Sequence, residues 1–142
     1  MRRRLISAAV AAISLAGLAF TSPASAASLP DRMYGCARGD FCMYSTEVIS
    51  AATKISIGRG ENWSSLASDS PYKGVRSFFN YGWPDTYDRV AVSFLLPNQG
   101  GYSFRCVPRA EEGNLPLGHK TVSVPVTVIH IEWVKAETCT GP

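Results

Sequence analysis

Hydrophobic and polar residues alternate along most of the chain beyond residue 40, and glycine or proline residues repeatedly interrupt the alternation. Side chains two positions apart lie on the same face of an extended strand, so this pattern is typical of strands that bury one face. Many short strands separated by Gly/Pro turns predict an all-β sandwich or small barrel. The expected strands are Phe41–Tyr44, Lys54–Ile57, Val75–Tyr81, Arg89–Phe94, Tyr102–Val107, Thr121–Val124 and Val126–Val134.

The connections between these strands make further predictions. The turn Gly82–Asp85 separates Val75–Tyr81 from Arg89–Phe94, a spacing that predicts a hairpin between the two strands. Pro125 interrupts the last hydrophobic run, and proline in a sheet suits an edge or a bulge. Trp63–Ala67 is the one stretch that could form a short helix, with a simple turn as the alternative.

The first 26 residues predict a secretory signal peptide. They begin with three arginines, continue with the apolar stretch Leu5–Phe20, and end with the small residues Ala24–Ala26. The apolar stretch is 16 residues long. A membrane-spanning helix needs about 20, so cleavage is favoured over an uncleaved anchor. We therefore expect a secreted, extracellular protein with a single β domain over residues 27–142, no contact with a membrane after cleavage, and a monomeric state.

Cleavage removes the apparent basic character of the chain. The full sequence has 14 Lys and Arg against 11 Asp and Glu, a formal charge of +3. Arg2, Arg3 and Arg4 lie in the predicted leader, whereas the first acidic residue is Asp31. Subtracting these three from 14 leaves 11 basic residues, which balance the 11 acids. Nucleic-acid binding requires a basic patch or stripe, so we do not expect a nucleic acid as the partner.

The chain has four cysteines, and all of them follow the predicted leader. An even number of cysteines in an exported protein implies two disulfides, for which three pairings are possible. We favour Cys36–Cys42, which closes a short local loop, and Cys106–Cys139, which ties the tail to a strand and contributes about 3 kcal/mol. Because no CxxC pair or neighbouring histidine is present, we expect neither a metal site nor a cofactor.

The sequence offers few residues for catalysis. His119 lies in a predicted loop, and His130 lies in an alternating run. A ribonuclease-like site is an alternative hypothesis, in which the histidines would act with Arg105 and with Glu111, Glu112 or Glu132. No serine lies in a Gly-x-Ser-x-Gly setting. We therefore expect no catalytic residues and no enzyme activity.

Aromatic residues gather around the Pro-Asp turn, at Tyr81, Trp83 and Tyr87. If these rings are exposed, they would anchor a partner, because aromatic residues dominate binding hot spots. The alternative is that at least one of them, Tyr81, belongs to the core. The loops that we consider for binding are Gly82–Asp88 and Glu111–Lys120. The predicted partner-binding residues are Trp83, Pro84, Asp85 and Tyr87.

Three sequence features together suggest a family. They are Cys36-x5-Cys42-Met43-Tyr44 just after the leader, Asn62-Trp63, and Val75-Arg76-Ser77-Phe78-Phe79-Asn80. This combination resembles a family of secreted actinomycete peptidase inhibitors, whose best-known kind is a small metalloproteinase inhibitor. The resemblance covers residues 36–94, and residues 95–142 would add further strands and a tail. It implies a Greek-key sandwich or small barrel of βγ-crystallin type, with short strands and two disulfides.

The resemblance also implies a function. The leading hypothesis is a peptidase-inhibitor-like protein that binds an extracellular protease through a preorganised loop, since a stiff loop loses less entropy on binding. The alternative is a binding module without inhibitory activity, which recognises a cell-wall polymer or another surface through Trp83. The stretch Tyr72–Ser77 lacks the acidic or amide residues of the crystallin calcium signature, so we expect no calcium site there.

Overall fold

The computed structural model describes residues 29–98, 100–111 and 114–139, so the predicted signal peptide lies outside the described residues. Within these ranges the chain forms strands, three short 3-10 turns and no α-helix, and no helical segment there is long and apolar enough to cross a membrane. The strands are β1 (Arg32–Met33), β2 (Cys36–Ala37), β3 (Asp40–Tyr44), β4 (Lys54–Arg59), β5 (Trp63–Ser64), β6 (Lys73–Asn80), β7 (Arg89–Leu95), β8 (Tyr102–Val107) and β9 (His119–Val134). The 3-10 turns are η1 (Ala51–Thr53), η2 (Leu115–Gly118) and η3 (Ala136–Thr138).

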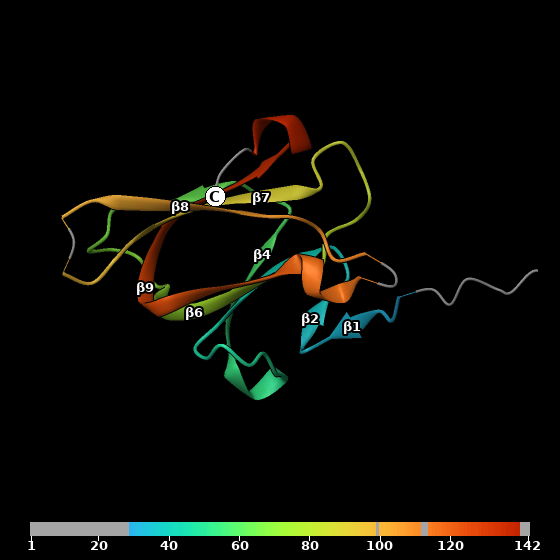
Figure 1. Cartoon of the computed structure of the whole chain (residues 1–142), viewed down its shortest axis with the longest axis horizontal. Coiled ribbons are helices and arrows are strands. Elements are labelled where there is room, and N and C mark those ends of the chain that lie inside the picture. The colour runs from blue at the N-terminus through green and yellow to red at the C-terminus, as the bar shows by residue number, and fades with distance from the viewer. Residues whose placement is uncertain (1–28, 99, 112–113, 140–142) are drawn as a thin grey trace, which may run out of the picture.

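All strand pairs are antiparallel, which confirms the prediction of an all-β protein. The main sheet has the order β4-β3-β6-β9-β7-β8. Strand β9 has 16 residues. It pairs with β6 up to Thr127 and with β7 from Thr127 onward, where β5 replaces β6 on its other side. Figure 1 shows β9 passing from the layer that contains β6 to the layer that contains β7.

The predicted hairpin between the strands now named β6 and β7 is wrong. Strand β9 lies between them, although it comes last in the sequence. The segment between β6 and β7 therefore connects the two layers instead of closing a tight turn, and Figure 1 shows it as a wide loop. Alternation identified each strand but not its neighbour, since pairing depends on contacts distant in sequence. Strands β7 and β8 do form a hairpin, from Val90↔Val107 to Leu95↔Tyr102.

The structure corrects two further local predictions. The two predicted strands on either side of Pro125 form one continuous strand, β9. Val126 pairs with Val75 and Thr121 pairs with Ser77, so the intervening β9 residues form an irregular segment that contains Pro125. Of the two alternatives for Trp63–Ala67, the helix is wrong and the turn is right in part, because Trp63 and Ser64 pair with β9 and a turn follows. Tertiary hydrogen bonds to β9 override the weak local helical tendency.

The main core lies between the two layers, and the partly buried Trp63 and Trp133 pack against it. Full burial of one aliphatic or phenylalanine side chain contributes about 1.5–3 kcal/mol, so this cluster supplies most of the driving force for folding. The core residues are Phe41, Met43, Val75, Phe78, Val90, Val92, Phe94, Val107, Val122, Val126, Val128 and Ile131.

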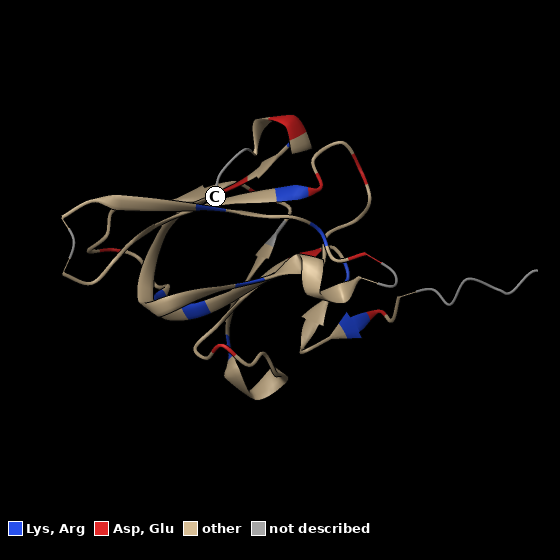
Figure 2. Cartoon of the chain, viewed as in Figure 1, with Lys and Arg blue, Asp and Glu red and all other residues tan. Residues whose placement is uncertain are grey.

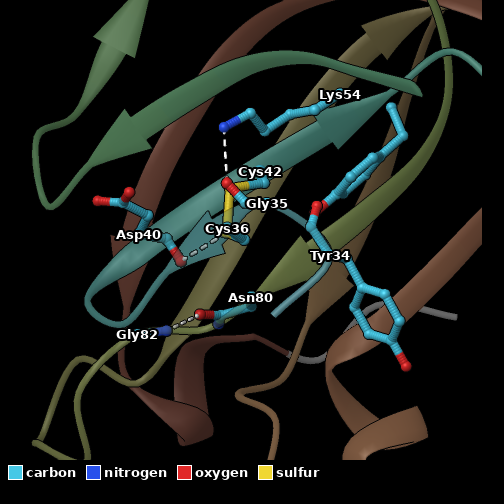
Figure 3. Close-up of a disulfide and its surroundings, with 9 residues drawn as sticks. Tyr34, Gly35, Cys36, Asp40, Cys42, Lys54, Asn80 and Gly82 are labelled. Atoms are coloured by element: carbon cyan, nitrogen blue, oxygen red, sulfur yellow. Dashed lines mark hydrogen bonds between the residues drawn. A yellow bond between two sulfur atoms is a disulfide. The ribbon is translucent and has the colours of Figure 1, made fainter. Parts of the chain in front are cut away.

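A second buried cluster covers the opposite face of β3 and β6, and it contains Cys36, Cys42, Phe79 and Tyr81. Cys36 and Cys42 form a disulfide with their Cα atoms 5.9 Å apart. Figure 3 shows the surroundings of this disulfide, where the Lys54 amine donates a hydrogen bond to the carbonyl oxygen of Gly35 at 2.6 Å. Because both faces of β3 are covered, all of its residues are buried.

The second disulfide joins Cys106 of β8 to Cys139, immediately after η3, with Cα atoms 5.5 Å apart. Both predicted pairings are therefore confirmed. The bridge attaches the end of the described chain to an edge strand, where it limits fraying.

Candidate functional site

The loop between β6 and β7 is exposed at its centre and buried at its start. Trp83 is 56% exposed and Tyr87 is 53% exposed, whereas Tyr81 is 1% exposed and belongs to the second cluster. Pro84 and Asp85 are exposed as well. Tyr81 is thus a core residue, and the other two rings are available at the surface.

The buried side chain of Asn80 holds both ends of this loop. Its Oδ1 accepts a hydrogen bond from the Gly82 amide at 3.0 Å, a contact drawn in Figure 3. Its Nδ2 donates to the carbonyl oxygens of Asp88, at 2.9 Å, and Val107, at 3.0 Å. Within the loop, Asp85 Oδ1 accepts from the Tyr87 amide at 2.6 Å, which is an Asx turn. The loop is therefore preorganised by hydrogen bonds at its base and at its tip.

Trp83 rests on the small disulfide loop between Cys36 and Cys42. Gly39 in that loop has φ +96°, and a Cβ atom there would be 2.6 Å from Trp83 Nε1. The Arg38 guanidinium carbon lies 4.9 Å from the centroid of the Trp83 ring, within the range of a cation–π contact. The Gly39 amide donates to the Tyr81 carbonyl at 2.8 Å. The disulfide loop thus supports the aromatic loop in addition to closing the fold.

Trp133, near the end of β9, lies behind the start of the same loop. A Cβ atom on Gly82 would be 2.7 Å from the Trp133 ring, so the indole packs directly on the glycine backbone. The backbone amide of Trp133 donates to Asn62 Oδ1 at 3.0 Å, which orients the Asn62 side chain. The indole Nε1 is buried, and within the described ranges it has no hydrogen-bond partner.

These groups surround a cleft of about 390 Å³. The cleft combines aromatic rings with a carboxylate and an amide, and Lys135 Nζ lies 5.7 Å from the centroid of the Tyr87 ring. Such a surface can contact an apolar ring face and form hydrogen bonds with polar groups on its edge. The residues that line the cleft are Gly39, Gly60, Asn62, Trp83, Asp85, Tyr87 and Trp133.

Three of the four predicted partner-binding residues line this cleft: Trp83, Asp85 and Tyr87. The fourth, Pro84, is exposed in the same loop but is not among the described residues that line the cleft. The prediction missed Trp133, although its position in an alternating run was visible in the sequence. What the sequence did not indicate is that β9 returns beside this loop.

The second predicted binding loop, Glu111–Lys120, is only partly described, because residues 112 and 113 fall outside the described ranges. The remainder contains η2 and the start of β9, where His119 is the first strand residue and not part of a loop. Burial is the main cause that lowers the pKa of His119. Gly118 lies so close to Ala110 that a Cβ atom would clash with its backbone at 2.6 Å.

The two histidines lie in different surroundings. His119 pairs with Phe79 and lines a pocket with Arg89 and Arg105. His130 pairs with Ser64 and Ser93, and its Nε2 lies 3.5 Å from Glu132 Oε2. Among the described residues, no group of three or more His, Cys, Asp or Glu gathers to hold a metal ion.

Comparison with known proteins adds no assignment. No protein-family model, no curated protein and no solved structure matches this chain. The resemblance to secreted peptidase inhibitors therefore stays a hypothesis that rests on the residues quoted above.

Proposed function

We propose that this protein is an extracellular binding module that holds a segment of polysaccharide, such as a cell-wall polymer, in the aromatic cleft. The observation that carries the proposal is that Trp83, Tyr87 and Trp133 line one concave surface together with Asn62 and Asp85. A sugar ring has an apolar C–H face and a hydroxylated edge. Aromatic rings suit the face, and the amide and carboxylate suit the hydroxyl groups.

The size of the cleft supports a small-ring ligand over a flat protein surface. Ligand sites in proteins span about 300–1,000 Å³, and this cleft measures about 390 Å³. A standard protein–protein interface instead buries about 800 Å² on each partner, mostly over a flatter surface. The cleft therefore fits a few sugar units of an extended polymer.

The rigidity of the cleft supports the same proposal. The Asn80 side chain forms hydrogen bonds with both ends of the loop, and Gly39 and Arg38 contact the Trp83 ring. Ordering a loop and its side chains on binding costs affinity, so a site that is already ordered retains more of its contact energy. More than half of the Trp83 side chain is nevertheless open to solvent and available to a ligand.

The test is retention of the purified protein on insoluble peptidoglycan and on chitin. We expect Trp83→Ala and Tyr87→Ala to weaken retention by roughly tenfold or more, about 1.4 kcal/mol. Tyr102→Ala is the matched control, because Tyr102 is an aromatic residue of β8 that is 75% exposed and lies outside the cleft. Retention that is the same in all three variants would exclude the cleft as the binding site.

The second candidate function is peptidase inhibition, with a fold of βγ-crystallin type. A specific observation favours it: the loop around exposed Pro84 is clamped at both ends by Asn80, as a loop that resists cleavage requires. The resemblance of Cys36–Tyr44 and Val75–Asn80 to the secreted peptidase inhibitors also favours peptidase inhibition.

Pro84 separates the two candidates, because it lies in the loop but not in the lining of the cleft. The protein should be incubated with a thermolysin-like protease and with serine proteases. If it is an inhibitor, Pro84→Gly should weaken inhibition, since it frees the backbone φ that proline fixes. The loss of inhibition should exceed any loss of polymer retention, because Pro84 is not among the described residues that line the cleft. Absence of inhibition of either protease class at micromolar protein would reject this candidate.

A further inference from the structure

A second pocket, of about 680 Å³, is lined by basic side chains that the aromatic cleft does not use. Arg89 begins β7, Arg105 lies in β8, and His119 and Lys120 begin β9. Three strands therefore bring these side chains to one pocket from positions far apart in the sequence. The remaining lining residues are Cys106, Pro108, Pro116, Leu117, Thr121 and Cys139.

The charged side chains that line this pocket are all basic among the described residues. No aspartate or glutamate of the described chain is among its lining residues. Figure 2 shows basic positions on β7 and β8, and the acidic positions lie mostly on the connecting loops. Beyond the predicted leader the chain has equal numbers of basic and acidic residues. The basic lining is therefore a local arrangement and not a consequence of overall composition.

Two of these cations have no counter-ion in the part of the chain that the structure describes. Within the described ranges, Arg89 and Lys120 form no ion pair, whereas Arg76 pairs with Glu47 and Arg109 lies 4.0 Å from Glu111. Arg89 and Lys120 are both half-buried where they line the pocket. Positive side chains that share a half-buried pocket repel one another, and a bound anion would relieve this repulsion.

The wall of the pocket is held in place covalently. The Cys106–Cys139 disulfide is part of the lining, and Cys106 is the immediate neighbour of Arg105. Arg89 and Arg105 belong to the paired strands β7 and β8, so their backbones are fixed relative to each other. A guanidinium group on such a support offers planar, two-pronged donors that match the oxygens of a phosphate.

We infer that this pocket binds the phosphate group of a ligand, with Arg89 and Lys120 as the charged contacts. The group can come from free phosphate or from a phosphodiester within a polymer. The inference does not depend on the polysaccharide proposal, because the pocket and the aromatic cleft have no lining residue in common.

The experiment follows backbone amide resonances by NMR while inorganic phosphate, or separately dimethyl phosphate, replaces chloride at constant ionic strength. We expect saturable shifts at residues 89, 105, 119 and 120. In the Arg89→Gln/Lys120→Gln variant the apparent Kd should weaken by roughly tenfold or more. The control is Arg32→Gln/Lys73→Gln, which removes the same charge from two exposed positions outside the pocket and should bind like the parent protein.

The two anions distinguish the sources of the phosphate group. Tight binding of dimethyl phosphate supports a phosphodiester polymer, and binding of inorganic phosphate alone supports free phosphate. The inference is overturned if neither anion gives saturable shifts, or if the control variant weakens binding as much as the pocket variant. If the double variant does not fold, Lys120→Gln alone provides the comparison, with Lys73→Gln as its control.

Discussion

The indole of Trp83 packs closely against Gly39, so a residue of the aromatic loop and a residue of the first disulfide loop together line the cleft. Any side chain at position 39 would force the indole to shift, since a Cβ atom there would be 2.6 Å from Trp83 Nε1. The Cys36–Cys42 disulfide therefore also affects the cleft, since the loop that it constrains contacts the Trp83 side chain.

Gly39→Ala should destabilise the fold and move Trp83. The new Cβ would meet the indole, and alanine disfavours the φ of +96°. We expect a loss of about 2–3 kcal/mol, of which the backbone conformation accounts for about 1 kcal/mol. Gly74→Ala is the control, because Gly74 has φ +75° and a Cβ atom there would have no neighbour within 4 Å. Urea unfolding measures the stability of both variants. Equal losses of stability in the two would mean that the clash with Trp83 contributes nothing to the effect of Gly39→Ala.

Asn80→Ala should loosen the aromatic loop. The amide side chain is fully buried and makes three hydrogen bonds, to Gly82, Asp88 and Val107. Removing it leaves buried backbone groups without partners, which costs about 1–3 kcal/mol. We expect lower stability in urea and faster amide hydrogen exchange across residues 82–88. Asn114→Ala, at an exposed position, should change stability by less than about 0.5 kcal/mol. Unchanged exchange in the Asn80 variant would contradict the role of this residue as a clamp.

Removing the second disulfide should destabilise the protein more than a typical point mutation does. Cys106 and Cys139 are 33 residues apart in sequence. The chain-entropy relation gives a loop of this length about 3–4 kcal/mol. We expect the Cys106→Ala/Cys139→Ala variant to lose a stability of this order in guanidinium unfolding. A loss below about 1 kcal/mol would show that the denatured chain gains little freedom when the bridge is absent.

His119 should make stability depend on pH. Burial is the largest influence and lowers the pKa of its imidazole in the folded protein; the backbone of Glu47 opposes this shift, and Lys120 adds a smaller lowering contribution. The unfolded chain, with a pKa near 6.5, therefore takes up the proton more readily than the folded chain. The stability contribution of neutral His119 is complete above about pH 6.5, and it is lost as the pH falls through the lower folded pKa.

The measurement is urea unfolding of the parent protein and of His119→Gln between about pH 5 and pH 8. The parent should lose more stability than the variant on the acidic side, since glutamine takes up no proton. If the stability of the two proteins changes with pH in the same way, burial does not lower the pKa of His119.

Much of the local structure followed from the sequence. Alternation located β3, β4, β6, β7 and β8 to within a few residues, because a strand at a sheet surface must segregate apolar side chains to one face. Both disulfide pairings were predicted from spacing and confirmed. The aromatic residues of the loop after β6 were identified as well, because Trp and Tyr beside a Pro-Asp turn are unusual in a solvated loop.

The partners of those elements could not be read from the sequence. Strand β9, last in the chain, inserts between β6 and β7, and it also brings Trp133 behind Gly82 and His119 beside Arg89 and Arg105. Hydrophobic periodicity shows which side chains of a segment face the core. It does not show which distant segment of the chain pairs with that strand. The strands, the bridges and Trp83, Asp85 and Tyr87 were thus determined by local sequence, whereas the cleft and the basic pocket were decided by long-range packing of β9.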